Sequence, residues 1–201
     1  MIFLSWLIVG YLSGSIPFAA IIAKARGVDI FKAGSGNPGA TNVMRSVGPW
    51  AGRLCFLFDA LKGFVPVILP LSITCTPSAL PLSHVFAAVA LIGAILGHSF
   101  SPWIKFRGGK GVATTIGGLF ALAPPVMFVG VVIWIAVFYL SRYVSLSSII
   151  MALWLPLGAW IFKADQVSFT VVTIIAFLII ARHKDNIVRL MKGTENRFGK
   201  K

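Results

Sequence analysis

The chain has 201 residues, of which 58% are hydrophobic and 11% are charged. There are 18 Lys and Arg but only 5 Asp and Glu, which gives a formal net charge of +13. Soluble domains are about 45–50% apolar and about 25% charged, so this composition excludes an ordinary soluble domain, a disordered tail and a coiled coil. A mean hydropathy of +0.92 indicates a membrane protein. In such a protein, excess Lys and Arg report orientation in the bilayer rather than nucleic-acid binding.

Apolar runs occupy most of the chain, and they predict an all-α integral membrane protein with a single domain over residues 1–201. A spanning helix takes about 20 residues. The seven expected transmembrane helices are approximately 2–23, 54–73, 82–97, 112–123, 126–140, 143–162 and 167–181. No Lys or Arg precedes the first run, as it would in a signal peptide, so we expect an uncleaved helix.

The count of seven depends on Pro124 and Pro125, which interrupt a long apolar region over 112–140. Proline removes a backbone donor and clashes with the preceding turn, so two helices are expected there. Lys and Arg concentrate in segments 24–53, 98–111, 141–145 and 182–201. Seven spans place all four segments on one side, which the positive-inside rule makes cytoplasmic. The N-terminus is then outside and the C-terminus cytoplasmic.

Two small-residue patterns lie within the expected spans. Gly10 and Gly14 form one G-x-x-x-G pattern, and Gly93 and Gly97 form another. Small residues at this spacing let two helices approach closely. We expect these glycines to serve helix packing rather than chemistry.

Residues 33–45 combine glycines, neutral hydrogen-bonding side chains and one arginine in the sequence AGSGNPGATNVMR. Glycine lets backbone N–H groups point at an anion, and arginine can bind phosphate through two parallel hydrogen bonds. A plain turn-rich loop would explain the Gly and Pro residues but not the rest of the segment. The candidate catalytic residues here are Ser35 and Arg45, and the candidate binding residues are Gly36, Asn37 and Thr41.

Residues 105–111 read KFRGGKG and lead directly into the next apolar run. Glycine-rich backbone that opens a helix offers N–H groups and the positive end of the helix dipole to a phosphate. Lys110 is followed by Gly111, so this is not a Walker A loop and nucleotide hydrolysis is not expected. Lys105 and Arg107 suit contacts with anionic headgroups. Lys110 is a candidate catalytic residue, and Gly108, Gly109 and Gly111 are candidate phosphate-binding residues.

Two later basic segments, 142–145 and 182–190, add polar candidates. Ser145 ends the first. His183 and Asn186 are three residues apart and share a face if the helix continues through them. Residues 187–190 predict an amphipathic helix on the membrane surface. Glu195 follows, and we expect it to give structural support to the tail rather than to take part in chemistry.

The acidic residues decide the class of mechanism. Only Asp29, Asp59, Asp185 and Glu195 fall on the expected cytoplasmic side. No pair has the close spacing of a metal site, and no Cys–His cluster is present. We therefore expect no metal and no cofactor, and an anion site built from glycine backbone and from Arg, Lys, Ser, Asn and His side chains.

Together these segments resemble the bacterial acyl-phosphate:glycerol-3-phosphate acyltransferases, the PlsY family. The likeness is carried by the glycine-rich segment 34–45, by Gly97-His98 with GGKGVAT at 108–114, and by the segments 142–145 and 182–190. The order and spacing of the motifs and the chain length also fit that family.

The resemblance implies a seven-helix enzyme of the bacterial inner membrane with its active site at the cytoplasmic face. The implied reaction moves a fatty acyl group from acyl phosphate to the 1-hydroxyl of glycerol 3-phosphate. The products are lysophosphatidate and phosphate, in the first step of phospholipid synthesis. The resemblance implies no metal, acyl-CoA or acyl carrier protein. The expected partners are the two substrates, membrane lipid and the enzyme that makes acyl phosphate.

The residues suit that chemistry. Acyl phosphate is already activated, so the enzyme can work by holding hydroxyl and carbonyl together and by stabilising negative charge. We assign Arg45 and Lys110 to phosphate charge, with N–H donors from the three glycines around Lys110. Ser35, Ser145 and Asn186 would orient substrate. His183 is either a general base for the hydroxyl or a phosphate ligand.

A small membrane transporter for anions or phosphate is the alternative. A transporter would favour polar or charged residues in mid-span. Here the polar groups gather on one side, and Lys163 and Asp165 are the only charges expected on the other. A purely structural membrane subunit would leave the glycine-rich loops unexplained.

Overall fold

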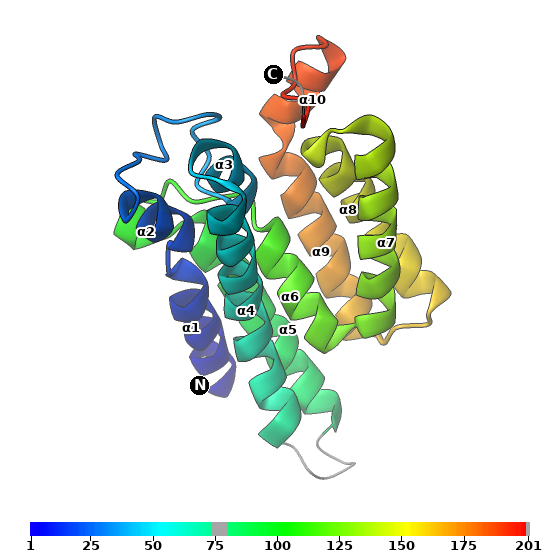
Figure 1. The fold of residues 1–201 in the computed structure, drawn as a ribbon. Coiled ribbons are helices and arrows are strands. Elements are labelled where there is room, and N and C mark those ends of the chain that lie inside the picture. Colours follow the sequence, from blue (N-terminus) through cyan, green and yellow to red (C-terminus); the bar gives the residue numbers. More distant parts are fainter. Residues whose placement is uncertain (74–79, 200–201) are drawn as a thin grey trace. The chain divides into compact units, whose positions relative to one another are not determined.

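The computed structural model describes residues 1–73 and 80–199, and these form helices and connecting segments without a strand (Figure 1). The chain divides into two compact units, Met1–Leu122 and Ala123–Lys201. The first contains α1 (Ile2–Ser15), α2 (Phe18–Lys24), α3 (Ala40–Ser46), α4 (Pro49–Ile73), α5 (Leu80–Ser99), the short 3-10 helix η2 (Pro102–Ile104) and α6 (Val112–Leu122). The second contains α7 (Pro124–Ser141), α8 (Val144–Ile161), α9 (Gln166–Arg182) and α10 (Lys184–Met191). The expected single domain over 1–201 stays a prediction.

The first apolar run is two helices rather than the continuous helix expected over 2–23. Helix α1 ends at Ser15 and α2 begins at Phe18, with Ile16 and Pro17 between them. Proline cannot donate to the preceding turn and disfavours helical geometry at the residue before it. The run is still a candidate span as a whole, because Ile2–Lys24 is long and apolar enough to cross a membrane.

Helices α1 and α5 approach closely through their small residues, as the G-x-x-x-G patterns predict. A Cβ added at Gly10 or Gly14 would collide with the α5 backbone at Ala90 or Ala94. A Cβ at Gly93 or Gly97 would collide with the α1 backbone in the same way. The prediction that these glycines serve packing is confirmed.

Close packing at glycines also joins α4 to α6. A Cβ at Gly63 would meet the carbonyl of Thr114, and one at Gly117 would meet the carbonyl of Ala60. Helices α1, α4, α5 and α6 therefore pack as a bundle in the first unit, in which α4 and α5 contact each other and both of the other helices. This packing fixes the helix ends from which the polar loops depart.

In the second unit α8 packs against both α7 and α9. The Nε1 of Trp154 donates to the Val126 carbonyl at 2.9 Å, which ties α8 to the start of α7. The break expected at Pro124 is confirmed, since α6 ends at Leu122 and α7 begins at Pro124. Proline is favourable there because backbone N–H groups in the first turn of a helix have no partner within the helix, so nothing is lost by the N–H that proline lacks.

By length and composition, five helical segments can cross a membrane: Ile2–Lys24, Pro49–Ser72, Leu82–Ile104, Pro124–Ser141 and Val144–Ile161. A sixth is obtained if α9 and α10, which meet at a bend of 56°, are counted as one span. Helix α6 is apolar but has only 11 residues. The described residues thus define an all-helical membrane protein with five or six candidate spans, fewer than the seven expected.

Candidate functional site

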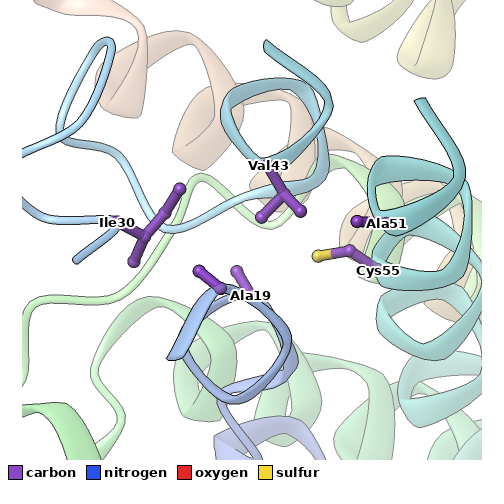
Figure 2. Packing of buried hydrophobic residues seen from close by; sticks show 6 residues of the cluster. Ala19, Ile30, Val43, Ala51 and Cys55 are labelled. Carbon is purple, nitrogen blue, oxygen red and sulfur yellow. The ribbon is translucent and has the colours of Figure 1, made fainter. Parts of the chain in front are cut away.

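The first glycine-rich loop is held on a small apolar cluster (Figure 2). Ile30, which precedes the loop, and Val43 on α3 are almost fully buried against α2 and α4. The cluster consists of Ala19, Ala23, Ile30, Val43, Ala51 and Cys55. Burial of Ile30 and Val43 fixes the two ends of the loop. The exposed residues between these ends have little apolar surface with which to anchor the loop themselves.

Asn42 holds the loop from inside. Its side chain is 2% exposed. The Nδ2 donates to the carbonyls of Ile30 at 3.2 Å and Ala33 at 3.0 Å. The Oδ1 accepts the backbone N–H of Ser35 at 3.0 Å and the hydroxyl of Ser46 at 3.4 Å. The carboxamide thus replaces the backbone pairing that an irregular loop lacks.

The candidate residues of this segment lie in the loop and on α3, and Ser35 is held directly by the Asn42 carboxamide. Ser35 is exposed, between Gly34 and Gly36, whose φ angles of +56° and +69° are in the left-handed region. Such angles favour glycine, so the G-S-G pattern is explained by backbone geometry. Thr41 lies in the first turn of α3, and Arg45 lies exposed in its last turn. Asn37 and Gly36 are half-buried in the loop itself.

The second glycine-rich loop folds back on the end of α5. The N–H of Gly108 donates to the Ser99 carbonyl at 3.2 Å. A Cβ at Gly108 would collide with the His98 carbonyl, and one at Gly109 would collide with the Nε2 of His98. Gly111 has a φ of +80°. Glycine is therefore required at each of these positions by close approach or by backbone geometry.

The two loops lie side by side. A Cβ at Gly109 would come within 3.0 Å of the carbonyl of Pro38, which belongs to the first loop. The guanidinium of Arg107 lies over the ring of Phe31, 5.3 Å from its centroid. Two segments that are about 70 residues apart in the sequence thus form one polar surface, with Lys110 partly exposed beside it.

Beneath this surface is a buried charged cluster that the sequence analysis did not assign to the site. Asp59 and Lys62 on α4 pair at 2.7 Å between Oδ1 and Nζ, and the Nδ1 of His98 lies 3.7 Å from the same Oδ1. The Nζ of Lys62 also donates to the Ile16 carbonyl at 2.8 Å. A small pocket is lined by Ser15, Pro38, Asp59, Lys62, His98 and Gly109, among others. It therefore connects the cluster to both loops.

The remaining candidates belong to the second unit, where Ser145 and Asn186 both contact Glu195. Its Oε1 accepts hydrogen bonds from Ser145 at 2.8 Å and from Asn186 at 2.7 Å. Its Oε2 accepts from the Nε of Arg189 at 2.7 Å. The supporting role expected for Glu195 fits these contacts. They also draw Ser145, from the start of α8, to the side of α10.

The electrostatics of Glu195 follow from these donors. Burial alone would raise the pKa of its carboxyl, but the hydrogen bonds from Asn186, Arg189 and Ser145 outweigh burial and lower the pKa below its usual range. The side chain is therefore a carboxylate at neutral pH. It can only accept hydrogen bonds in that form, which fixes the direction in which Ser145 and Asn186 point their protons.

His183 stands at the bend between α9 and α10 and is 3% exposed. The chain turns by 56° there, so the condition under which His183 and Asn186 would share a helix face is not met. The Nδ1 of His183 lies 2.7 Å from the Ile179 carbonyl. Because a carbonyl only accepts, Nδ1 carries the proton of this bond. In the neutral imidazole, Nε2 is then the acceptor nitrogen.

The C-terminal tail closes over the turn between α7 and α8. The N–H of Phe198 donates to the Arg142 carbonyl at 2.8 Å, and its ring packs edge-on against Phe138 at 5.6 Å. The guanidinium of Arg197 lies 6.0 Å from the ring of Tyr143. The tail thus holds the 142–145 segment in addition to carrying Glu195. The helix expected near 187–190 is present as α10.

The candidates therefore divide into two groups according to the compact unit to which each belongs. The first group contains Ser35, Gly36, Asn37, Thr41, Arg45, Gly108, Gly109, Lys110 and Gly111, and the second contains Ser145, His183, Asn186 and Glu195. Sequence reasoning did not identify Asn42 as the support of the first loop, or Asp59 and Lys62 as a buried pair. A signal for that pair was present, because two opposite charges at i, i+3 in an apolar run are rare in membrane helices. In residues 1–73 and 80–199 no three His, Cys, Asp or Glu side chains gather as a metal site would require.

The helices and the paired glycine-rich loops define a helical membrane protein with a glycine-rich polar surface where the two loops meet. The sequence profile of the glycerol-3-phosphate acyltransferase family matches residues 4–193. The chain belongs to this family.

Individual relatives agree over nearly the whole length. A glycerol-3-phosphate acyltransferase of Thermotoga petrophila is 40% identical over 195 residues, covering 96% of this chain and 95% of the relative. Glycerol-3-phosphate acyltransferase 1 of Deinococcus radiodurans is 43% identical over 202 residues, covering 97% and 95%.

Two crystal structures of PlsY (YgiH), an integral membrane glycerol 3-phosphate acyltransferase, share the fold at 38% identity. The glycerol 3-phosphate form matches with a TM-score of 0.90 over 98% of this chain and 96% of that chain. The lysophosphatidic acid form matches with a TM-score of 0.87 over 98% and 95%. The resemblance inferred from the motifs is confirmed.

Proposed function

We propose that this protein transfers a fatty acyl group from acyl phosphate to the 1-hydroxyl of glycerol 3-phosphate, giving lysophosphatidate and phosphate. Acylation of glycerol 3-phosphate follows from membership of the family, whose solved member has a glycerol 3-phosphate form and a lysophosphatidic acid form. This membership also decides against the transporter alternative. We propose in addition that the acyl donor is acyl phosphate, that no cofactor is used, and that individual residues have the roles given below.

The observation that carries the proposal is the contact between the two glycine-rich loops at Gly109 and Pro38. A reaction between acyl phosphate and glycerol 3-phosphate brings two phosphate groups to one enzyme. Two adjacent loops rich in backbone N–H groups, each with a cation at its end, suit such a pair of anions. The cations are Arg45 on α3 and Lys110 before α6, which we assign to phosphate charge.

Within the first unit, Gly109 and Gly111 supply N–H donors to phosphate. The N–H of Gly108 already donates to the Ser99 carbonyl, so Gly108 contributes by its lack of a side chain. Ser35, with Gly36, Asn37 and Thr41 around it, orients substrate by hydrogen bonds. This mode of catalysis needs no covalent intermediate, because the phosphate of an acyl phosphate is already a leaving group. The enzyme contributes orientation and stabilisation of negative charge on the carbonyl oxygen.

Within the second unit, Ser145 and Asn186 orient substrate while Glu195 fixes their position. His183 has two proposed roles. With Nδ1 held by the Ile179 carbonyl, the neutral ring presents Nε2 as a base for the glycerol 3-phosphate hydroxyl. A protonated ring would instead present Nε2–H to a phosphate oxygen. In that case an oxygen of the acyl phosphate can take the proton of the hydroxyl.

We propose a bacterial inner-membrane location with seven spans, the N-terminus outside and the C-terminus and active site on the cytoplasmic side. The distribution of Lys and Arg supports this topology. It requires α6 and α9 each to cross the bilayer. At about 1.5 Å per residue, the 11 residues of α6 extend roughly 17 Å, so α6 needs the extended segments at its ends to complete a span. The enzyme that makes acyl phosphate is a candidate partner.

The experiment that tests this function measures phosphate release by the purified protein. It is given acyl phosphate and glycerol 3-phosphate in the presence of a metal chelator, with formation of lysophosphatidate followed in parallel. Equal amounts of both products are expected. Activity only with acyl-CoA, or only after metal is added, would overturn the proposal.

A further inference from the structure

The Asp59–Lys62–His98 cluster contains more charge than helix packing requires. Asp59 and Lys62 are 1% and 5% exposed, and both lie on a helix that can span the membrane. Taking two charges out of water is costly even when they pair. Such residues in membrane helices are therefore a reason to look for a functional role.

Lys62 by itself has a structural explanation. Its Nζ donates to the Ile16 carbonyl, just beyond the end of α1, and its own carbonyl accepts the hydroxyl of Ser13 at 2.9 Å. A cation at a helix C-terminus satisfies carbonyls that have no partner within the helix. Asp59 balances this cation at 2.7 Å. The pair thus fastens α4 to the break at Pro17.

His98 is not explained in this way. Its Nδ1 faces Asp59 at 3.7 Å, and its Nε2 lies where a Cβ at Gly109 would have to go. Asp59 also accepts the Sγ–H of Cys55 at 3.5 Å, so its carboxylate is held on both sides. The imidazole therefore lies between a fixed carboxylate, which its Nδ1 faces, and the glycine-rich loop, which its Nε2 contacts at Gly109.

We propose that Asp59 and His98 are positioning residues for the phosphate-binding backbone of residues 108–111, with Lys62 neutralising the carboxylate. This rests on the function proposed for that loop. Glycine backbone has wide conformational freedom, whereas an anion site must be held within about 0.5 Å of its working geometry. The glycines have no side chains with which to anchor themselves. A rigid ring braced on a buried ion pair supplies that anchor from below.

The test compares Michaelis constants in four purified proteins: wild type, Gly109→Ala, His98→Ala and His84→Ala. Gly109→Ala disturbs the loop directly and identifies the substrate whose phosphate the loop holds. His98→Ala is expected to raise the KM for that same substrate by about tenfold, with a smaller change in kcat, because it loosens a binding surface. His84 lies toward the other end of α5 and is the matched control, with unchanged constants expected.

A merely structural role gives a different result. If His98→Ala only reduces the fraction of folded protein, the apparent kcat falls and both KM values stay at their wild-type levels. That result overturns the inference, as does an increase in the KM for the other substrate alone. Failure of the loop function is distinguishable, because Gly109→Ala would then leave both KM values unchanged. Failure of the acyl-phosphate reaction appears separately, as absence of phosphate release from wild type.

Conservative variants and a double mutant sharpen the test. In His98→Gln the side-chain amide reaches the position of Nε2, so a smaller increase in KM is expected than in His98→Ala. Asp59→Asn is expected to raise the KM for the same substrate that His98→Ala affects. In His98→Ala/Gly109→Ala the new methyl group no longer meets the imidazole, so the two effects on KM should be less than multiplicative. Strictly multiplicative effects would mean that His98 does not act through Gly109.

Discussion

The Nδ2 of Asn186 donates a hydrogen bond of 2.7 Å to the Oε1 of Glu195, so a carboxylate in the C-terminal tail fixes a side chain on α10. Ser145 donates to the same oxygen at 2.8 Å. Two residues proposed to orient substrate therefore depend on one acceptor. Glu195 is also the only glutamate in the chain, so no similar side chain can replace it.

Replacement of Glu195 by alanine is expected to destabilise the protein and to lower activity. Asn186 and Ser145 lose their shared acceptor and Arg189 loses its ion pair, and each charge-assisted hydrogen bond contributes about 1.5–3 kcal/mol. Thermal unfolding in detergent measures the loss. Glu195→Gln keeps the shape and one acceptor oxygen, so a smaller loss is expected. Asp185→Ala, which removes an exposed acid on the neighbouring helix α10, is the control and should leave stability nearly unchanged.

Stability should also fall on acidification through Glu195. The folded-state pKa of its carboxyl lies below the ordinary value, which is about 4.3 for glutamate. A lowered pKa gives stability that is fully present above the unfolded-state value and is lost as pH falls through the folded-state value. Unfolding temperatures should therefore decline below about pH 4.3, and less steeply in Glu195→Gln. Parallel curves for the two proteins between pH 6 and pH 3 would count against this role.

Asn42 is expected to be as important for the first loop as the residues that bind substrate. Its buried carboxamide uses both its donor and its acceptor atoms. Asn42→Ala leaves buried groups unpaired, at about 1–3 kcal/mol. Asn42→Asp keeps the acceptor but places a second oxygen against the carbonyls of Ile30 and Ala33, so it should be no better tolerated. Ser46→Ala removes only the weakest of the four contacts, and near-wild-type unfolding is expected. Equal unfolding temperatures for all three variants would contradict this account.

Much of this architecture is predictable from the sequence because hydrophobic runs and prolines act locally. The break at Pro124 and the glycine contacts between α1 and α5 are such cases. The break at Pro17 was missed because the apolar run continues across it. Its stability depends on Lys62, which reaches the Ile16 carbonyl from another helix, and such a long-range contact leaves no local pattern.

The candidate residues were predictable by type, since glycine, arginine and lysine in loops point to anions. Their supports were not. Asn42 looks like any polar residue of a turn-rich segment, and nothing in its neighbourhood reveals that its four hydrogen-bond partners will surround it. His98 likewise comes close to Gly109 only because the 100–107 segment folds back on the end of α5.

If Arg45 and Lys110 contact phosphate, removing either of them should lower activity much more than removing another exposed cation. Arg45→Ala and Lys110→Ala should each reduce kcat/KM by about 10- to 100-fold, which corresponds to a charge-assisted hydrogen bond of about 1.5–3 kcal/mol. Lys105→Ala should have little effect, although Lys105 is exposed and only five residues before Lys110. Arg45→Lys should recover part of the activity but not all, because an ammonium group cannot make the two parallel bonds of a guanidinium. Kinetics at constant ionic strength measure all four variants. Similar losses at Lys105, Lys110 and Arg45 would show that net positive charge, and not these two residues, attracts the phosphorylated substrates.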